Sequence, residues 1–270
     1  MPRVTANGAE LNYEVAGKGP SLLLIHGGGV DGGTFKKLAA VLASDFTLVT
    51  YDRRGLSRSP RPTNWSQTSI AEQAEDAAGL LRALGVAPAA VLGQSLGALI
   101  ALELLLRHPE LVRRAILLDP GPIDIAVPDR REKMALLPEN EAIRTGIATG
   151  GPEAGFEALL RGLGAWDAMD PESRRRVRGN AEIFFNYETP LLQSYRPDHG
   201  LLNGNRVPVQ VAAGSETPPV FSEMAEWLAT RLKVRVVTSP GGHVGYLNHP
   251  DEVAHLIRPF LLDKPQESFR

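Results

Sequence analysis

The sequence predicts an α/β fold whose sheet is mostly parallel. Six short runs of residues are mostly apolar, which is typical of strands covered on both faces in a parallel sheet. Helical stretches lie between these runs, and strands that alternate with helices along a chain form α/β folds. The 270 residues include 43% hydrophobic and 22% charged residues, so the chain has enough apolar surface to fold as a globular protein.

The strands are predicted from their apolar runs and from the residues that end them. Asn7 and Gly8 form a two-residue turn signal, after which residues 9–15 return as a strand. The first four buried runs end at a glycine-rich loop, at Asp52, at Gly93 and at Asp119, so each leads directly into a loop. The six buried runs are residues 21–25, 46–51, 89–92, 115–118, 207–213 and 234–238.

Four helices are predicted from capping signals and apolar spacing. Ser69 and Glu72 have the spacing of a capping box, which opens a helix that runs to about residue 84. Residues 96–107 are nearly all apolar and are interpreted as a buried helix. The last two helices are predicted at residues 221–232 and 252–262.

Residues 121–206 interrupt this alternation, because they contain helical stretches but no convincing strand. They are interpreted as a helical cap inserted into a core made of residues 1–120 and 207–270. Insertions at the carboxyl ends of strands often roof a ligand pocket. Arginines at 130–131 and 174–176 are expected on solvated helix faces. Four aromatic residues are expected either to line the pocket or to pack the cap onto the core: Trp166, Phe184, Phe185 and Tyr187.

Composition and charge exclude several kinds of partner. The chain carries 29 Lys and Arg against 31 Asp and Glu, a net charge of −2, which predicts no binding to nucleic acid or to an anionic membrane. It has no cysteine, which excludes disulfides, thiol catalysis and thiolate metal sites. The N-terminus lacks the apolar core of a signal peptide, and polar residues interrupt the most apolar stretch, residues 87–106. A cytoplasmic location is therefore expected.

The strongest chemical signal is Gly-Gln-Ser-Leu-Gly at residues 93–97, between a predicted buried strand and a predicted buried helix. A serine at such a tight turn has a strained backbone, and the residues two positions away must be small, as Gly93 and Gly97 are. The turn pushes the hydroxyl of Ser95 out of the sheet as a nucleophile. It also leaves the N–H of Leu96 free at a helix N-terminus, where the helix dipole favours negative charge.

A second glycine-rich segment, residues 26–29, directly follows the first buried run and reads His-Gly-Gly-Gly. Glycines let backbone N–H groups approach an oxyanion, so the N–H of Gly28 is expected to form an oxyanion hole with that of Leu96. The general base is assigned to His243, in the glycine-rich loop after the last strand. The other histidines are interpreted as structural or exposed, with His26 organising its loop: His26, His108, His199, His249 and His255.

Four segments, in their order along the chain, resemble the α/β-hydrolase superfamily, and the resemblance spans nearly the whole chain. It implies an eight-stranded sheet with serine, acid and histidine on loops at its carboxyl edge, and residues 121–206 as the variable cap. It also implies that Asp52, Arg53 and Arg54 build a structural turn. The segments are His-Gly-Gly-Gly at 26–29, Tyr-Asp-Arg-Arg-Gly-Leu-Ser-Arg-Ser at 51–59, the serine turn at 93–97, and Gly242-His243.

The acid departs from the commonest pattern of the superfamily. Many members carry Asp in a Gly-x-x-Asp loop after the seventh strand, but this loop reads Gly-Ser-Glu-Thr, with Thr217 at the expected place and Glu216 one residue before it. A subset that includes some lactone hydrolases and dehalogenases places the acid after strand six, where Asp119 stands here. Asp119 is therefore expected to orient His243 and stabilise its cation, with Glu216 as the alternative and Asp124 as a third choice.

These observations predict a serine hydrolase that cleaves a small to medium carboxylic ester or lactone through an acyl-enzyme, without cofactor or metal. Its partner is a small-molecule substrate, and both a monomer and a homodimer are compatible with the sequence. Carbon–carbon bond hydrolases and thioesterases of the same fold, and a small-molecule receptor with slow turnover, remain alternatives. Dehalogenases and epoxide hydrolases of the superfamily use Asp as nucleophile, so Ser95 disfavours both.

Overall fold

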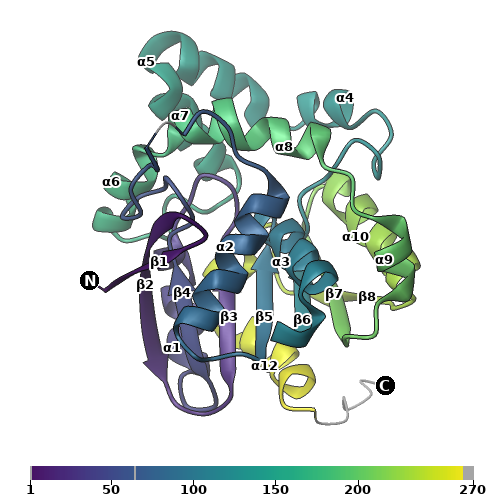
Figure 1. Ribbon diagram of the computed structural model, residues 1–270. Coiled ribbons are helices and arrows are strands. Elements are labelled where there is room, and N and C mark those ends of the chain that lie inside the picture. Colours follow the sequence, from purple (N-terminus) through teal and green to yellow (C-terminus); the bar gives the residue numbers. More distant parts are fainter. Residues whose placement is uncertain (1, 64, 264–270) are drawn as a thin grey trace.

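The computed structural model describes residues 2–63 and 65–263, which form a central sheet with helices on both faces (Figure 1). The sheet has eight strands in the order β1-β2-β4-β3-β5-β6-β7-β8. β1 and β2 pair antiparallel, as do β2 and β4, and all other neighbours are parallel, which confirms the predicted sheet. The strands are β1 (Arg3–Ala6), β2 (Ala9–Gly17), β3 (Ser21–Ile25), β4 (Thr47–Tyr51), β5 (Ala89–Gln94), β6 (Val112–Leu118), β7 (Val209–Gly214) and β8 (Val236–Ser239).

The parallel register brings the strand ends that carry the motifs to one edge of the sheet. Ile25 pairs with Gly93, Gln94 pairs with Leu118, and Leu118 pairs with Ala212. The loops that follow β3, β5, β6 and β7 therefore start at the same level. All six residues of β5 are buried, as expected for a central strand covered on both faces.

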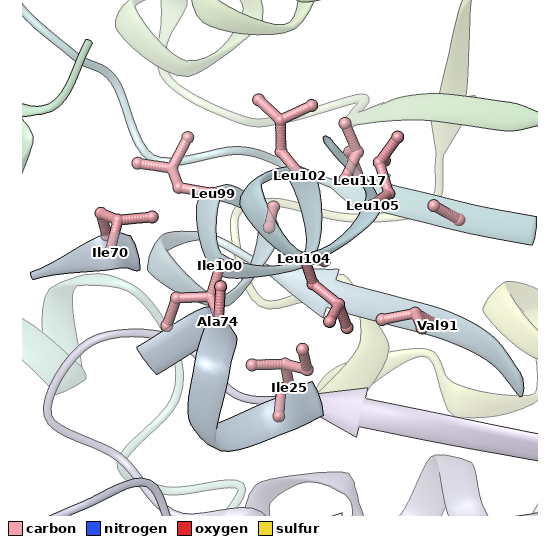
Figure 2. Close-up of a cluster of buried hydrophobic side chains, with 14 of the residues drawn as sticks. Ile25, Ile70, Ala74, Val91, Leu99, Ile100, Leu102, Leu104, Leu105 and Leu117 are labelled. Atoms are coloured by element: carbon pink, nitrogen blue, oxygen red, sulfur yellow. The ribbon is translucent and has the colours of Figure 1, made fainter. Parts of the chain in front are cut away.

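Helices cover the two faces of the sheet with separate apolar clusters. α2 (Ile70–Ala83), α3 (Leu96–Arg107) and α10 (Pro219–Leu232) pack on one face, and α1 (Lys36–Leu42) and α12 (Pro250–Leu261) pack on the other. Figure 2 shows leucines of α3 in one cluster with Ile70 and Ala74 of α2 and with the strand residues Ile25 and Val91. α3 packs on β5 and β6 with α2 beside it, and eleven of its residues, 96–106, are buried, which explains its uniform apolarity.

Two local predictions differ from the structure. Ser69 caps α2 by accepting from the N–H of Glu72 at 2.9 Å, but the Glu72 carboxylate pairs with Arg54 instead of closing a capping box. α1 was not predicted, because its seven residues bury only Leu38 and Leu42 and are too short to show a helical period.

Between β6 and β7 the chain forms helices, and we call residues 121–206 the helical region. Figure 1 shows α5, α7 and α8 together beyond one end of the strands. Among the described residues, no helix combines the length and apolarity needed to span a membrane. The helical region contains α4 (Arg130–Ala135), α5 (Glu139–Gly162), α6 (Pro171–Arg178), α7 (Ala181–Ile183), the π-helix η3 (Phe184–Glu188), α8 (Thr189–Ser194) and α9 (His199–Gly204). Elsewhere lie the 3₁₀ helices η1 (Gly32–Phe35) and η2 (Pro109–Leu111), and α11 (Gly245–Asn248).

Candidate active site

Ser95 occupies a strained turn between β5 and α3. Its φ of 54° and ψ of −120° lie in a region that non-glycine residues rarely adopt. A Cβ atom at Gly93 would lie 2.1 Å from the carbonyl oxygen of Gly97, and one at Gly97 would lie 2.1 Å from that of Ile25. Backbone therefore surrounds the turn so closely that both flanking positions require glycine, the steric condition inferred from the sequence.

The imidazole of His243 lies beside the serine hydroxyl. Its Nε2 is 3.0 Å from Oγ of Ser95, and only 6% of the residue is exposed. The side-chain amide of Gln94 donates to the carbonyl oxygen of His243 at 2.9 Å, and the ring of Phe221 packs against the imidazole with centroids 4.0 Å apart. These contacts hold the loop after β8 so that the imidazole faces the serine.

The structure places Asp119 on the other side of the imidazole. Asp119 directly follows β6, with a φ of 47°, and is buried, and its Oδ2 lies 3.4 Å from Nδ1 of His243. This separation is longer than that of a well-formed hydrogen bond. Both carboxylate oxygens and Nδ1 are buried without a hydrogen-bond partner among the described residues, so an unsatisfied acceptor and an unsatisfied donor face each other.

The two other acids that the sequence offered lie elsewhere. Glu216 is exposed, and no ion pair or hydrogen bond joins its carboxylate to His243 in the described part of the chain. Asp124 is 43% exposed and pairs with Arg130 at 2.5 Å. Thr217, at the place of the commonest acid, has a buried hydroxyl without a hydrogen-bond partner among residues 2–63 and 65–263. The acid nearest the imidazole is therefore the one that follows β6.

Two residues of the described chain with free backbone N–H groups, Gly28 and Leu96, line the pocket that holds the serine. A Cβ atom at Gly27 would lie 3.2 Å from Cβ of Ser95, so the loop after β3 approaches the serine closely. Within the described chain, no acceptor takes the N–H of Gly28, and Leu96, as the first residue of α3, has no helical carbonyl to bind. Gly28 and Leu96 both line the same pocket as Ser95 and His243, where such donors can bind an oxyanion.

The pocket over Ser95 has a volume of about 130 Å³ and a mostly apolar wall. Core loops form its floor, and the helical region supplies much of its side and roof. Few polar groups other than those beside Ser95 reach it, so it suits an apolar ligand with one reactive polar centre. Apolar residues from the helical region in the wall include Met134, Leu137, Phe156, Leu159, Phe184 and Leu192.

Of the four aromatic residues expected at the pocket, Phe184 lies in its wall and the other three do not. Trp166 is buried and packs beneath the guanidinium groups of Arg161 and Arg174. Tyr187 stacks on Trp65, with centroids 5.1 Å apart. Phe185 packs edge-on against Phe184. The pocket prediction is wrong for Trp166, Phe185 and Tyr187, because the sequence does not orient the helices that carry them.

Arg176 and Arg130, which were expected on solvated helix faces, form ion pairs with acids instead. Arg176 is not on a solvated face, since its guanidinium pairs at 2.8 Å with buried Asp31 of the core. Arg130 is likewise 6% exposed in its pair with Asp124. Asp52 does build a turn, by binding the side chain of Arg58 and the N–H of Gly32.

Glu188, which was not predicted as a site residue, is a carboxylate of the helical region that is 2% exposed and lies in the pocket wall. It pairs with Arg53, which is 1% exposed. His26 lies in the same buried cluster, where burial and the Arg53 charge hold its pKa well below the usual value of 6.5 and keep the ring neutral. No signal in the sequence distinguishes Glu188 from the exposed acids of the helical region. Across the described residues, no group of three His, Asp or Glu side chains is arranged to hold a metal ion.

Comparison with known proteins supplies the family context for this geometry. A family model described as the alpha/beta hydrolase fold matches residues 20–250. The uncharacterized hydrolase YraK of Bacillus subtilis is 31% identical, over 94% of this chain and 93% of its own length. A fluoroacetate dehalogenase of Burkholderia sp. is 28% identical, over 94% and 90% respectively. The structure of the enol-lactonase of Burkholderia xenovorans LB400 superimposes with a TM-score of 0.78, over 97% of this chain and all of its own. The two sequences are 20% identical, so this similarity is one of fold.

Proposed function

This chain belongs to the α/β-hydrolase family and is an α/β-hydrolase enzyme, and from that premise we propose that it is a serine hydrolase of small to medium carboxylic esters or lactones. One observation carries the proposal. The hydroxyl of Ser95, on a strained turn, lies 3.0 Å from Nε2 of His243, in a pocket that Gly28 and Leu96 also line. A hydroxyl, a base and oxyanion donors in this arrangement support acyl transfer.

In the proposed mechanism, Oγ of Ser95 attacks the carbonyl carbon while Nε2 of His243 takes the hydroxyl proton. Asp119 stabilises the imidazolium that forms, through the buried contact at 3.4 Å. The N–H groups of Gly28 and Leu96 bind the oxyanion, and each such donor is worth about 3 kcal/mol in the transition state. His243 then protonates the leaving alkoxide, and a water molecule activated by the same ring releases the acid and regenerates Ser95.

The pocket supports a small or medium apolar substrate. Its volume of about 130 Å³ leaves room for a short acyl or ring substituent, and leucine and phenylalanine side chains dominate the part contributed by the helical region. An ester or lactone whose only strongly polar group is the reacting carbonyl matches this wall. The same wall gives no cationic partner for a substrate carboxylate.

We do not propose halide displacement for this chain, although it is similar to a fluoroacetate dehalogenase. Dehalogenases of the superfamily form an ester on an aspartate nucleophile, whereas position 95 is serine. A serine hydroxyl activated by histidine favours attack on a carbonyl carbon over displacement at a saturated carbon.

Ser95→Ala tests the proposal. We expect hydrolysis of p-nitrophenyl butyrate to fall by at least about 1,000-fold, because the nucleophile is removed, while the melting temperature stays near that of the wild type. A fluorophosphonate probe should label Ser95 of the wild-type protein, as read by peptide mass spectrometry. Ser194→Ala, in an exposed serine of α8, is the matched control and should keep full activity. Full activity of the Ser95 variant would overturn the proposal.

A further inference from the structure

A buried ion pair joins the helical region to the glycine-rich loop after β3. Glu188 ends the π-helix η3, and its Oε1 lies 2.5 Å from Nη1 of Arg53. Its other oxygen, Oε2, accepts from the N–H of Gly29 at 2.6 Å. One carboxylate of the helical region therefore binds both the loop backbone and the cation beneath that loop. Both side chains are at most 2% exposed, so water screens neither charge.

Arg53 binds the peptide unit that carries the proposed oxyanion donor. Its Nη2 donates to the carbonyl oxygen of Gly27 at 2.7 Å. This carbonyl belongs to the same amide as the N–H of Gly28. A cation bound to the oxygen of an amide draws electron density from its nitrogen, and hydrogen bonds in such chains strengthen one another. Arg53 thus holds the plane of this amide and makes the N–H of Gly28 a stronger donor.

His26 adds a second donor to the same carbonyl. Its Nε2 lies 3.1 Å from the backbone N–H of Arg53 and accepts from it, which leaves the ring proton on Nδ1. Nδ1 then donates to the carbonyl oxygen of Gly27 at 2.9 Å. With this tautomer, the approach of Nε of Arg53 to Nδ1 at 3.4 Å is a contact between two donors and not a hydrogen bond.

The second proposed oxyanion donor is prepared differently. The amide that carries the N–H of Leu96 has the carbonyl of Ser95, which accepts from Ala98 at 3.0 Å and from Gly121 at 3.1 Å. Both of these donors are neutral backbone groups. The cation therefore acts on one side of the site only, the side reached from the helical region.

The π-helix also fixes the position of the loop by steric contact. A Cβ atom at Gly28 would lie 2.9 Å from Cε2 of Phe184, and one at Gly29 would lie 3.0 Å from Cβ of Phe184. Phe184 and Glu188 begin and end η3, and both line the pocket. A π-helical turn inside a run of α-helix often marks a functional site.

We propose that Glu188 and Arg53 are positioning residues that hold and polarise the Gly27–Gly28 amide, so that its N–H faces the oxyanion. The negative charge of Glu188 keeps the guanidinium in place and balances it, and the helical region thereby completes the oxyanion site as well as roofing the pocket. This inference rests on the proposed serine mechanism, because the amide matters only if an oxyanion forms beside it.

Glu188→Gln is the primary test, because it keeps the side-chain volume and removes the charge that holds the guanidinium. We expect kcat for p-nitrophenyl butyrate to fall about tenfold, less than the roughly 100- to 1,000-fold that follows loss of a whole donor. The KM should stay within about twofold, since the ground-state carbonyl bears little charge. A trifluoromethyl ketone forms a tetrahedral adduct with Ser95 whose oxyanion occupies the same site, so its inhibition constant should rise by the same factor as kcat falls.

A double-substitution series distinguishes charge balance from packing. Arg53→Met removes the cation and leaves the Glu188 carboxylate unpaired beside the oxyanion, so its kcat should fall about 100-fold. Adding Glu188→Gln removes that charge, and the double variant should be more active than Arg53→Met alone. If packing were the whole effect, the two losses would add. A double variant less active than either single variant would overturn the proposal.

Arg176→Met is the matched control, because Arg176 also joins the helical region to a buried core acid, Asp31, without touching residues 27–29. It should lower the melting temperature and leave kcat and the inhibition constant unchanged. An equal loss of kcat in this variant, or wild-type kcat in Glu188→Gln, would overturn the inference. The proposed function fails separately, if the fluorophosphonate does not label Ser95 of the wild-type protein.

Discussion

The sheet edge and the helical region contribute to the same pocket by different physical means. At the sheet edge, strand register and backbone contacts place Ser95, Asp119 and the glycine-rich loop, and positions 93 and 97 admit no side chain. The helical region is joined to the core loops by side-chain contacts, which include the pair of Glu188 with Arg53 and that of Arg176 with Asp31. Strand register follows from backbone hydrogen bonds, whereas the contacts between helices and loops depend on individual side chains.

Asn180 illustrates the second kind of contact. It lies between α6 and α7, accepts from the N–H of Ser57 at 2.8 Å and donates to the carbonyl oxygen of Gly29 at 2.9 Å. It is buried, so these hydrogen bonds are not exchanged with water. The comparison predicts that changes at the sheet edge affect the chemical step or the fold itself. Changes in the apolar wall of the helical region should affect substrate choice, whereas Glu188, which binds the loop after β3, should affect the chemical step.

The largest expected effect is that of Asp119→Asn. Loss of the buried negative charge beside Nδ1 of His243 removes the group that stabilises the imidazolium and sets its tautomer, so kcat should fall by about 10⁴. Steady-state kinetics with p-nitrophenyl butyrate measure this loss. Glu216→Gln, in the exposed acid of the neighbouring loop, is the control and should change kcat less than about twofold. A crippled Glu216 variant with a mild Asp119 variant would assign the acid to the loop after β7.

Gly97→Ala tests the claim that backbone contacts shape the sheet edge. The added methyl group would lie 2.1 Å from the carbonyl oxygen of Ile25 and 2.5 Å from that of His26, so backbone must move. We expect the free energy of unfolding, measured by urea denaturation, to fall by about 3 kcal/mol or more.

Gly204→Ala is its control in the helical region. Nothing lies within 4 Å of a Cβ atom at that position, and the free energy of unfolding should change by less than about 1 kcal/mol. Equal losses in the two variants would mean that the serine turn is no more constrained than the end of α9.

This division also explains which parts of the molecule could be predicted from the sequence. The buried strands appear in the sequence as apolar runs, and the turn at Ser95 appears as two glycines around a serine. The backbone geometry of the sheet edge determines where both patterns occur. Asp119 could be singled out because it directly follows a recognisable strand, where the resemblance to part of the superfamily implies the acid. The packing of the helical region could not be predicted, because α5 bends at Gly151, with a φ of 74°, and its hydrophobic residues show no clear single face. Glu188, in η3, was missed because nothing in the sequence distinguishes it from the exposed acids of the helical region.

Leu137→Phe tests whether the helical region selects the substrate. Leu137 lies in the pocket wall, and a larger side chain there takes volume from a cavity of about 130 Å³. We expect kcat/KM for p-nitrophenyl hexanoate to fall about tenfold, while that for the acetate stays within about twofold, because misfit of one methylene is worth about 1–3 kcal/mol.

Leu136→Phe is the control, since Leu136 is next in the chain and 83% exposed. It should leave the ratio of the two kcat/KM values unchanged. A uniform loss with both esters in Leu137→Phe would mean that this wall affects the chemical step instead of chain length.

The smallest expected effect is a pH dependence of stability that arises from His26, at the sheet edge. Burial and the charge of Arg53 lower the pKa of His26 in the folded protein, so the unfolded chain binds a proton at a higher pH than the folded one. The stability that neutral His26 contributes is therefore fully present above about pH 6.5 and is lost as the pH falls toward the folded pKa, by at most about 1.4 kcal/mol per pH unit.

Urea denaturation at pH 7.5 and pH 5.5 should show this loss in the wild type, and His26→Gln, which cannot take up the proton, should show a loss smaller by about 1 kcal/mol. Equal losses in the two proteins would mean that His26 of the folded protein is protonated at pH 5.5. Its Nε2 could then not accept from the N–H of Arg53, which lies 3.1 Å away.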